Sequence, residues 1–368
     1  MHPELFEIPF IHWPVRSFGV MMVIGFLLGF FIIGKLSRNV ISNPQLITNL
    51  ALYCLIAGVI GARIFYVVHH FDRLDRPLAS MFAVWRGGLE FYGGVIFAIP
   101  VIVFYTRYHK LPVRQCLDIM AIALMLGLAF GRIGCFWNGC CFGKPSELPW
   151  AVRFPYDSFV YFSQINADPK RDRPAPQIIL PHDEYSSYPD IKTTLYPKPF
   201  DELTEQQKFE VTKGKYRSLR IHPTQLYSSA NAALLCLVLY LFWRRSQKAV
   251  RLDKTRTLFA QPGHTFALAF ILYGITRFMI EYLRDDNPFE YAWWALYKGG
   301  TVSQNLSIYL ILLGVVLIAL FQITKPNSAA TKNAVNSKNR KLVPAKAGSE
   351  TQKLVPGEAK RLKVIRAP

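Results

Sequence analysis

Seven runs of apolar residues, each close to the length of a membrane-spanning helix, punctuate the chain. They cover about residues 17–34, 47–68, 92–106, 116–133, 224–243, 264–283 and 302–323. A bilayer core requires roughly 20 consecutive apolar residues in a helix. The pattern therefore predicts an all-α polytopic membrane protein with seven transmembrane helices.

One long polar stretch interrupts this pattern between the fourth and fifth predicted spans. Residues 144–221 are rich in Pro, Asp, Lys and Tyr and contain no apolar run of span length. The stretch is too long for an ordinary connection, so it predicts a small extramembrane domain. The chain then divides into residues 1–143 with four spans, 144–221, 222–324 with three spans, and a tail, 325–368.

The distribution of charge predicts how the chain is oriented. Hydrophobic residues make up 51% of the sequence, yet its formal net charge is +19. Basic residues crowd the loops after spans one, three and five and the tail, which holds eleven Lys or Arg. The positive-inside rule then places the N-terminus and the extramembrane domain outside and the C-terminus in the cytoplasm. The net charge thus reflects topology, and nucleic-acid binding is not expected. No basic segment precedes the first apolar run, so we expect no cleaved signal peptide.

The tail itself is basic and poor in apolar residues. This composition predicts a disordered segment near anionic lipid, or a solvated tail without specific function.

Four charged residues lie within the predicted spans or at their outer ends: Arg63, Arg132, Arg277 and Glu281. A charge near the centre of a membrane helix costs about 2.5–3.5 kcal/mol. Such residues therefore face a bundle interior, pair with one another, or hold a charged ligand. Three arginines on different spans favour a phosphate clamp, because guanidinium groups match phosphate oxygens in bidentate fashion. A purely structural ion pair between Arg277 and Glu281 is the alternative.

The sixth span and its exit carry a regular polar spacing. Tyr273, Arg277, Glu281 and Arg284 follow one another at intervals of four, four and three. On one helix this spacing predicts a single polar stripe with net positive charge.

A glycine-rich stretch, 131–143, follows the fourth apolar run. Four glycines here indicate backbone that approaches something closely, which we interpret as an anion-handling site at one membrane face. Its cysteines, Cys135, Cys140 and Cys141, could form a disulfide, pack as thiols or include a reactive thiol. No metal is expected, because the spacing is not a standard zinc pattern and further ligands would be needed.

The segment 222–227, His-Pro-Thr-Gln-Leu-Tyr, opens the fifth span from the outer side. It places several hydrogen-bonding side chains at the level of the glycine-rich stretch. A simple helix entry with a cap is the alternative interpretation.

Four patterns in order, at 87–94, 131–143, 222–227 and 273–281, resemble the signatures of the bacterial prolipoprotein diacylglyceryl transferase family. The resemblance implies a bacterial cytoplasmic (inner) membrane enzyme with seven spans and no cofactor. It implies transfer of the diacylglyceryl group from phosphatidylglycerol to the lipobox cysteine of a preprolipoprotein, whose signal peptide is a partner. A thioether forms and glycerol phosphate leaves.

The resemblance also implies two groups of site residues. The expected catalytic residues are Arg132, Asn138, Arg277, Glu281 and Tyr92. The expected lipid-binding residues are Arg63, Arg132, Gly143, His222, Gln225 and Tyr227.

The chain departs from the family's usual pattern at four positions. Tyr92 stands where the family usually has His, Cys135 where it has Asn, Cys140 where it has Glu, and Phe18 where it has Tyr. A tyrosine, with an ordinary pKa of about 10, is a poor base, so the base is unassigned. A catalytically inactive relative that binds lipid or precursor is therefore an alternative. A transporter is disfavoured because the spans show no internal repeat.

Overall fold

The computed structural model describes residues 4–8, 13–71, 88, 90–188, 194–251 and 261–324. Most of the loop between the second and third predicted spans, much of the basic loop after the fifth, and the basic tail lie outside the described residues.

All seven predicted apolar segments are helices. Five of them are long and apolar enough to cross a membrane: α1 (Ser17–Ser37), α2 (Gln45–His69), α5 (Val113–Asn138), α9 (Thr224–Arg251) and α11 (Val302–Ile323). The other two are α4 (Phe91–Tyr108), a shorter apolar helix, and α10 (His264–Glu281). Exposed apolar side chains such as Phe31, Phe104 and Leu124 cover the outer faces of these helices. The chain is therefore a polytopic membrane protein.

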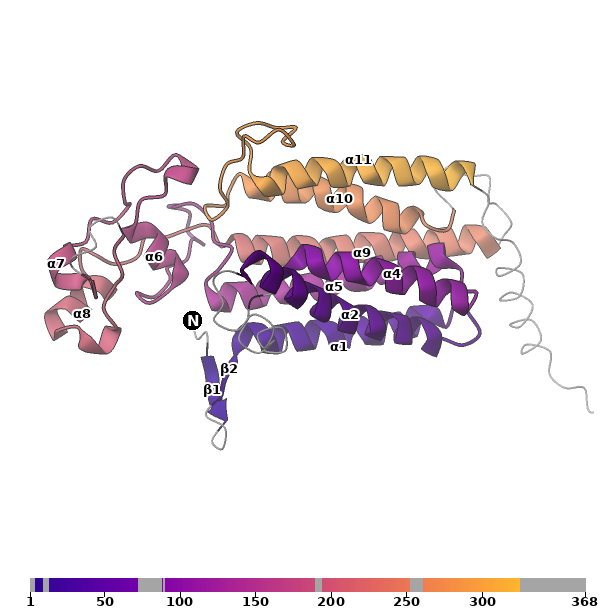
Figure 1. The fold of residues 1–368 in the computed structure, drawn as a ribbon, viewed down its shortest axis with the longest axis horizontal. Helices are drawn as coiled ribbons and strands as arrows, with labels where there is room; N and C mark the ends of the chain where they lie inside the picture. The colour runs from indigo at the N-terminus through magenta and orange to yellow at the C-terminus, as the bar shows by residue number, and fades with distance from the viewer. Residues whose placement is uncertain are drawn as a thin grey trace, which may run out of the picture.

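The seven helices run side by side along the long axis of the molecule (Figure 1). The main helix pairs are α1 with α5, α2 with α4, α5 with α9, and α10 with α11. α1 begins at the end of the bundle that carries the segment 144–221, and α11 ends at the opposite end (Figure 1).

Two short strands before α1 add to the predicted all-α fold. Strands β1 (Glu4–Ile8) and β2 (Trp13–Arg16) form an antiparallel hairpin that leads directly into α1. Aromatic and β-branched residues favour strands, and pairing satisfies backbone groups of the lead-in.

Glycines allow neighbouring helices to approach closely. A Cβ added to Gly61 on α2 would lie 2.5 Å from the carbonyl oxygen of Gly93 on α4. A Cβ added to Gly274 on α10 would lie 2.8 Å from the carbonyl oxygen of Ser307 on α11. Small residues commonly mediate such contacts between membrane helices. Gly93 of the 87–94 pattern and Gly274 of the 273–281 pattern therefore serve helix packing.

Among its described residues, the segment 144–221 contains three short α-helices, α6 (Phe159–Ile165), α7 (His182–Tyr185) and α8 (Glu205–Thr212). It has a hydrophobic cluster of its own, made of Tyr156, Tyr161, Ile165, Ile178, Leu180, Tyr185, Leu195, Leu203 and Val211. Isolated β-bridges from Ile221 to Pro145 and Val152 close the segment at the bundle. Both ends of the segment therefore return to the same end of the helices.

Candidate functional site

The last turn of α10 carries a buried ion pair. Arg277 Nη1 lies 2.5 Å from Glu281 Oε2, and the two side chains are 12% and 0% exposed. Arg277 Nη2 also donates to Ser303 Oγ at 2.9 Å. The pair predicted from spacing is therefore present, and α11 helps to hold it.

Glu281 is the centre of a wider hydrogen-bond network. Its Oε1 accepts from Thr301 Oγ1 at 2.9 Å and from Asn287 Nδ2. Thr301 is also the N-cap of α11, in a capping box with Gln304. Sequence reasoning missed Asn287, Thr301 and Ser303. The capping box predicts where α11 begins, but nothing local predicts that the capping hydroxyl also reaches Glu281.

Arg284 does not continue the predicted helical stripe, because α10 ends at Glu281. It forms an isolated bridge with Gly143 and makes a bidentate contact with Asp286, from Nε at 2.8 Å and Nη2 at 2.6 Å. Its Nε is 3.8 Å from Glu281 Oε2. Burial alone would lower the pKa of Arg284, but the hydrogen bonds and charge of Asp286 reverse this and raise it. Arg284 is therefore a permanent cation beside Glu281.

Arg132, near the end of α5, is the third guanidinium here, beside Arg277 and Arg284. We call these three arginines, with Glu281 and Asp286, the ionic cluster. It lies within electrostatic reach of Tyr273, Arg284 and Arg277. Among the residues that the structure describes, its guanidinium has no hydrogen-bond or ion-pair partner. Three guanidinium groups here face two carboxylates, those of Glu281 and Asp286, so 3 − 2 leaves one positive charge in excess. The arrangement is suited to an added anion.

Arg63 makes its described contacts elsewhere. Its Nη1 donates to the carbonyl oxygen of Gly88 at 2.9 Å, and its guanidinium carbon lies 5.3 Å from the centre of the Tyr66 ring. Tyr92 lies at the start of α4 and is 51% exposed. Both residues belong to the α2–α4 pair, whereas the ionic cluster is built on α5, α10 and α11.

The glycine-rich stretch is helical as far as Asn138, beyond the predicted end of the fourth apolar run at residue 133. α5 continues to Asn138, and a Cβ added to Gly134 would lie 3.1 Å from the Phe18 ring of α1. Gly139 then ends the helix with a left-handed φ of 76°. The first glycines of the stretch therefore pack helices, and only its end forms a turn.

Gly143 lies where three segments of backbone meet. A Cβ at this position would lie 2.6 Å from the carbonyl oxygen of His222 and 2.8 Å from that of Leu283. Lys144 N donates to the Leu283 oxygen at 2.8 Å, and His222 N donates to the Lys144 oxygen at 3.0 Å. Gly143 thus holds the exits of α5 and α10 and the entry of α9 together.

Gly143→Ala is expected to lower the free energy of unfolding by about 1–3 kcal/mol, because two backbone oxygens would have to move. Thermal unfolding in detergent would measure this change. Gly19→Ala in α1 is the matched control, since nothing lies within 4 Å of its added Cβ. Equal stability of the two variants would contradict the close approach.

The segment 222–227 binds the turn after α5. Gln225, which is fully buried, donates from Nε2 to the carbonyl oxygen of Cys140 at 2.8 Å. Thr224 Oγ1 donates to the carbonyl oxygen of Cys141 at 2.9 Å. The Tyr227 hydroxyl accepts from Trp150 Nε1 at 2.7 Å and lies 3.4 Å from His222 Nδ1.

The three cysteines of the stretch form a cluster of thiols. The Sγ atoms of Cys135, Cys140 and Cys141 all lie within 4.8 Å of one another. All three are free, and Cys140 Sγ donates to the carbonyl oxygen of Cys135 at 3.8 Å. Of the alternatives raised by the sequence, the described structure therefore has packed thiols rather than a disulfide.

Arginines of the segment 144–221 attach it to the exit of α10. Arg173 Nη1 lies 2.8 Å from Asp285 Oδ2, and Arg171 Nη2 donates to the carbonyl oxygen of Arg284 at 2.6 Å. Burial raises the pKa of Asp285, opposed by the charges of Arg173 and Arg171. The segment 144–221 is thus linked directly to Asp285 and to the backbone of Arg284.

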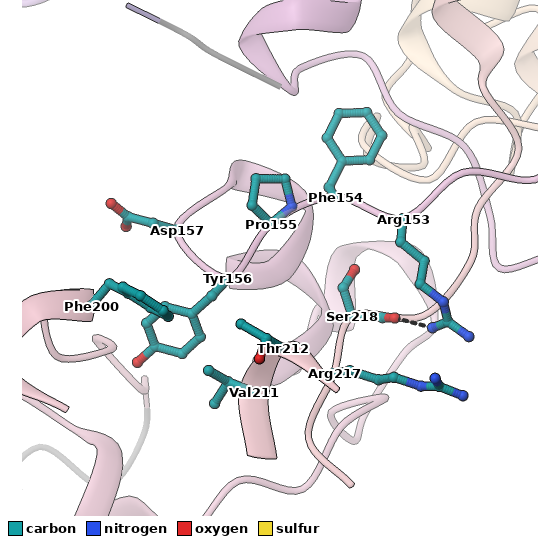
Figure 2. Close-up of a pocket in the computed structure, with 10 residues that line it drawn as sticks. All are labelled: Arg153, Phe154, Pro155, Tyr156, Asp157, Phe200, Val211, Thr212, Arg217 and Ser218. Carbon is teal, nitrogen blue, oxygen red and sulfur yellow. Dashed lines mark hydrogen bonds between the residues drawn. The ribbon is translucent and has the colours of Figure 1, made fainter. Parts of the chain in front are cut away.

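A separate hollow of about 310 Å³ lies within the segment 144–221. Figure 2 shows the rings of Tyr156 and Phe200 on one side of it and the side chains of Arg153 and Arg217 on the other. Arg153 Nη1 donates to the carbonyl oxygen of Ser218. No pattern in the sequence predicts this hollow, since its residues come from distant parts of an irregular segment.

Comparisons with known proteins agree over most of the chain. The sequence profile of the family described as "Prolipoprotein diacylglyceryl transferase" matches residues 3–320. A phosphatidylglycerol–prolipoprotein diacylglyceryl transferase of Prochlorococcus marinus (strain NATL1A) is 26% identical over 355 residues, covering 92% of this chain and 96% of the relative. The enzyme of the same name from Clostridium tetani is 24% identical and covers 88% of this chain and 100% of the relative. That from Xanthomonas oryzae pv. oryzae (strain PXO99A) is 28% identical and covers 84% and 87%.

Proposed function

Since the chain belongs to the prolipoprotein diacylglyceryl transferase family, we infer that it transfers a diacylglyceryl group from phosphatidylglycerol to prolipoproteins. It is a transferase of lipoprotein maturation. In the reaction, the sulfur of the lipobox cysteine forms a bond to the glycerol carbon. The bond from that carbon to the phosphate oxygen breaks, and glycerol phosphate leaves.

The guanidinium of Arg132, which has no hydrogen-bond or ion-pair partner in the described part of the chain, is the observation that supports this chemistry at the ionic cluster. The leaving phosphate gains negative charge in the transition state, and fixed cations stabilise such charge. We assign Arg132 as the principal phosphate ligand, with Arg277 beside it. Arg277 and Arg284 are already held by carboxylates, so they add to the field with little rearrangement.

Glu281 fits the role of a positioning residue better than that of a base. Its described contacts are all with donors or cations, including Arg277, Thr301 and Asn287. These contacts fix the carboxylate, which in turn orients Arg277.

The attacking thiol still requires activation, since a free cysteine has a pKa of about 8.5. The excess positive charge of Arg132 would favour the thiolate form of the attacking cysteine. Tyr92 occupies the position where the family usually has His, and we retain it as a candidate to contact the reacting groups. Arg63, on the neighbouring helix α2, is the candidate for a second lipid contact.

We assign the remaining site residues to the turn after α5 and its immediate surroundings. Gln225 fixes the turn after α5 from α9, and Gly143 allows that turn to meet the exit of α10. We assign Asn138, His222 and Tyr227 to the lipid-binding surface around this turn. Together they would hold the phosphatidylglycerol headgroup against Arg132.

We further propose seven membrane spans in the bacterial cytoplasmic membrane, with the N-terminus and the domain 144–221 outside and the basic tail 325–368 in the cytoplasm. The opposite ends at which α1 begins and α11 ends support this topology (Figure 1), as do the basic loops. Signal peptides of the precursors would then approach from within the membrane, and nucleic acid has no part. Reporter fusions within 144–221 and after residue 324 should report opposite sides; the same side for both would contradict the topology.

The transfer assay tests the proposal directly. Purified protein in detergent, mixed with phosphatidylglycerol and a lipobox peptide, is expected to raise the peptide's mass by one diacylglyceryl unit. A peptide with serine in place of the cysteine should remain unmodified. Absence of a mass shift from folded, lipid-bound protein would instead support an inactive relative, which the departures at Tyr92, Cys135 and Cys140 motivate.

A further inference from the structure

The thiol cluster at the exit of α5 has the dimensions of a metal site. The Sγ atoms of Cys135, Cys140 and Cys141 lie within 4.8 Å of one another. With metal–sulfur bonds of about 2.3 Å, an ion at the centre of three sulfurs requires sulfur–sulfur separations of about 4 Å. A disulfide would need one pair of sulfurs at about 2.05 Å and would leave the third thiol outside it.

The local backbone brings these sulfurs together from a short stretch of chain. Gly139 ends α5 with a φ of 76°, and Cys141 has a φ of 59°. A positive φ is uncommon for a residue other than glycine. Gln225 and Thr224 bind the carbonyl oxygens of Cys140 and Cys141, so α9 fixes this turn.

The surroundings suit a site with net negative charge. Three thiolates leave two negative charges around a monovalent cation and one around a divalent cation. Arg132 and Arg284 both lie within electrostatic reach of Cys141, and Cys135 is buried at the end of α5. Nearby guanidinium groups would stabilise the anionic cluster.

We propose that Cys135, Cys140 and Cys141 form a three-thiolate site for a thiophilic metal ion, copper(I) or zinc(II). Soft thiolate ligands select these ions. Binding forms three metal–sulfur bonds, and the thiol protons pass to solvent. Copper(I) is expected to bind the more tightly, since zinc(II) usually takes four ligands and the cluster of described residues supplies three.

The test uses the full-length protein, purified in detergent with a reductant and then freed of metal. Cadmium(II) is the spectroscopic probe, because its thiolate complexes absorb in the ultraviolet. Copper(I) and zinc(II) are titrated separately against a chelator. We expect one ion per chain, and a loss of affinity of more than about tenfold for Cys135→Ser, Cys140→Ser or Cys141→Ser, since even outer-sphere changes cost that much at metal sites.

Cys54→Ser and Cys236→Ser are the matched controls, because both thiols lie in the helix bundle outside the cluster. Both should keep the affinity and the cadmium absorption of the unmodified protein. Alkylation and intact mass on the same samples report the state of the thiols. Three free thiols without a bound ion, a mass lower by two hydrogens owing to a disulfide, or equal loss in the controls would each overturn the proposal.

Discussion

Arg132→Ala is expected to lower the turnover number for diacylglyceryl transfer by about 10²–10³-fold, the usual cost of removing one fixed donor to a charged transition state. Arg132 has no hydrogen-bond or ion-pair partner among the described residues and supplies the one positive charge in excess at the ionic cluster. Its removal therefore disturbs few native contacts and acts mainly on the phosphate. Steady-state kinetics with phosphatidylglycerol and a lipobox peptide would separate the effect on turnover from the effect on the Michaelis constant.

Two further variants make this result specific. Arg107→Ala removes an exposed arginine in the last turn of α4 and should leave transfer unchanged. Arg132→Lys keeps the charge but loses the bidentate geometry, so its rate should lie between those of the wild type and the alanine variant. Wild-type turnover in Arg132→Ala would exclude this residue from the chemistry.

The second large effect concerns stability. Glu281→Gln is expected to lower the free energy of unfolding by about 3–5 kcal/mol, because it leaves a buried cation without its counter-charge. Arg277 is 12% exposed and Glu281 is fully buried, so water cannot replace the lost carboxylate. Thermal or denaturant unfolding in detergent would measure the change.

Glu205→Gln provides the contrast. Glu205 pairs with Lys208 at 2.9 Å, but its side chain is 90% exposed. Its replacement should change the free energy of unfolding by less than about 0.5 kcal/mol. Similar effects of the two substitutions would show that the Arg277–Glu281 pair is not an important part of the stability.

The helices were predictable from the sequence, whereas their ends were not. A long apolar run has few alternatives to a helix in a membrane, and every predicted run is one. α5, however, continues past the predicted boundary, because Gly134 packs against Phe18 of α1. Glycine is common both in turns and where two helices pack closely. Only the position of the neighbouring helix shows which of the two applies.

The candidate site was predictable only in part, because the sequence does not show which helices lie next to one another. Spacing on one helix correctly joined Arg277 to Glu281. The sequence also indicates that Arg63 and Arg132 lie near the same depth, but not which way each helix faces. α2 pairs with α4, so Arg63 binds the carbonyl oxygen of Gly88. Contacts from the start of α11, such as Thr301 with Glu281, depend on tertiary structure alone.

The contacts between α10 and the start of α11 affect how the protein is inserted into the membrane during its synthesis. α10 carries Arg277 and Glu281 and is not among the helices that qualify as spans by length and apolarity. It leaves the ribosome before Thr301 and Ser303, which later hold its charged pair. Charges within a membrane helix cost free energy on insertion unless they are paired, although less near the helix end than at its centre. The translocon would therefore release α10 stably only together with α11, as a hairpin, and a nascent chain arrested before residue 301 should leave α10 extractable from the membrane.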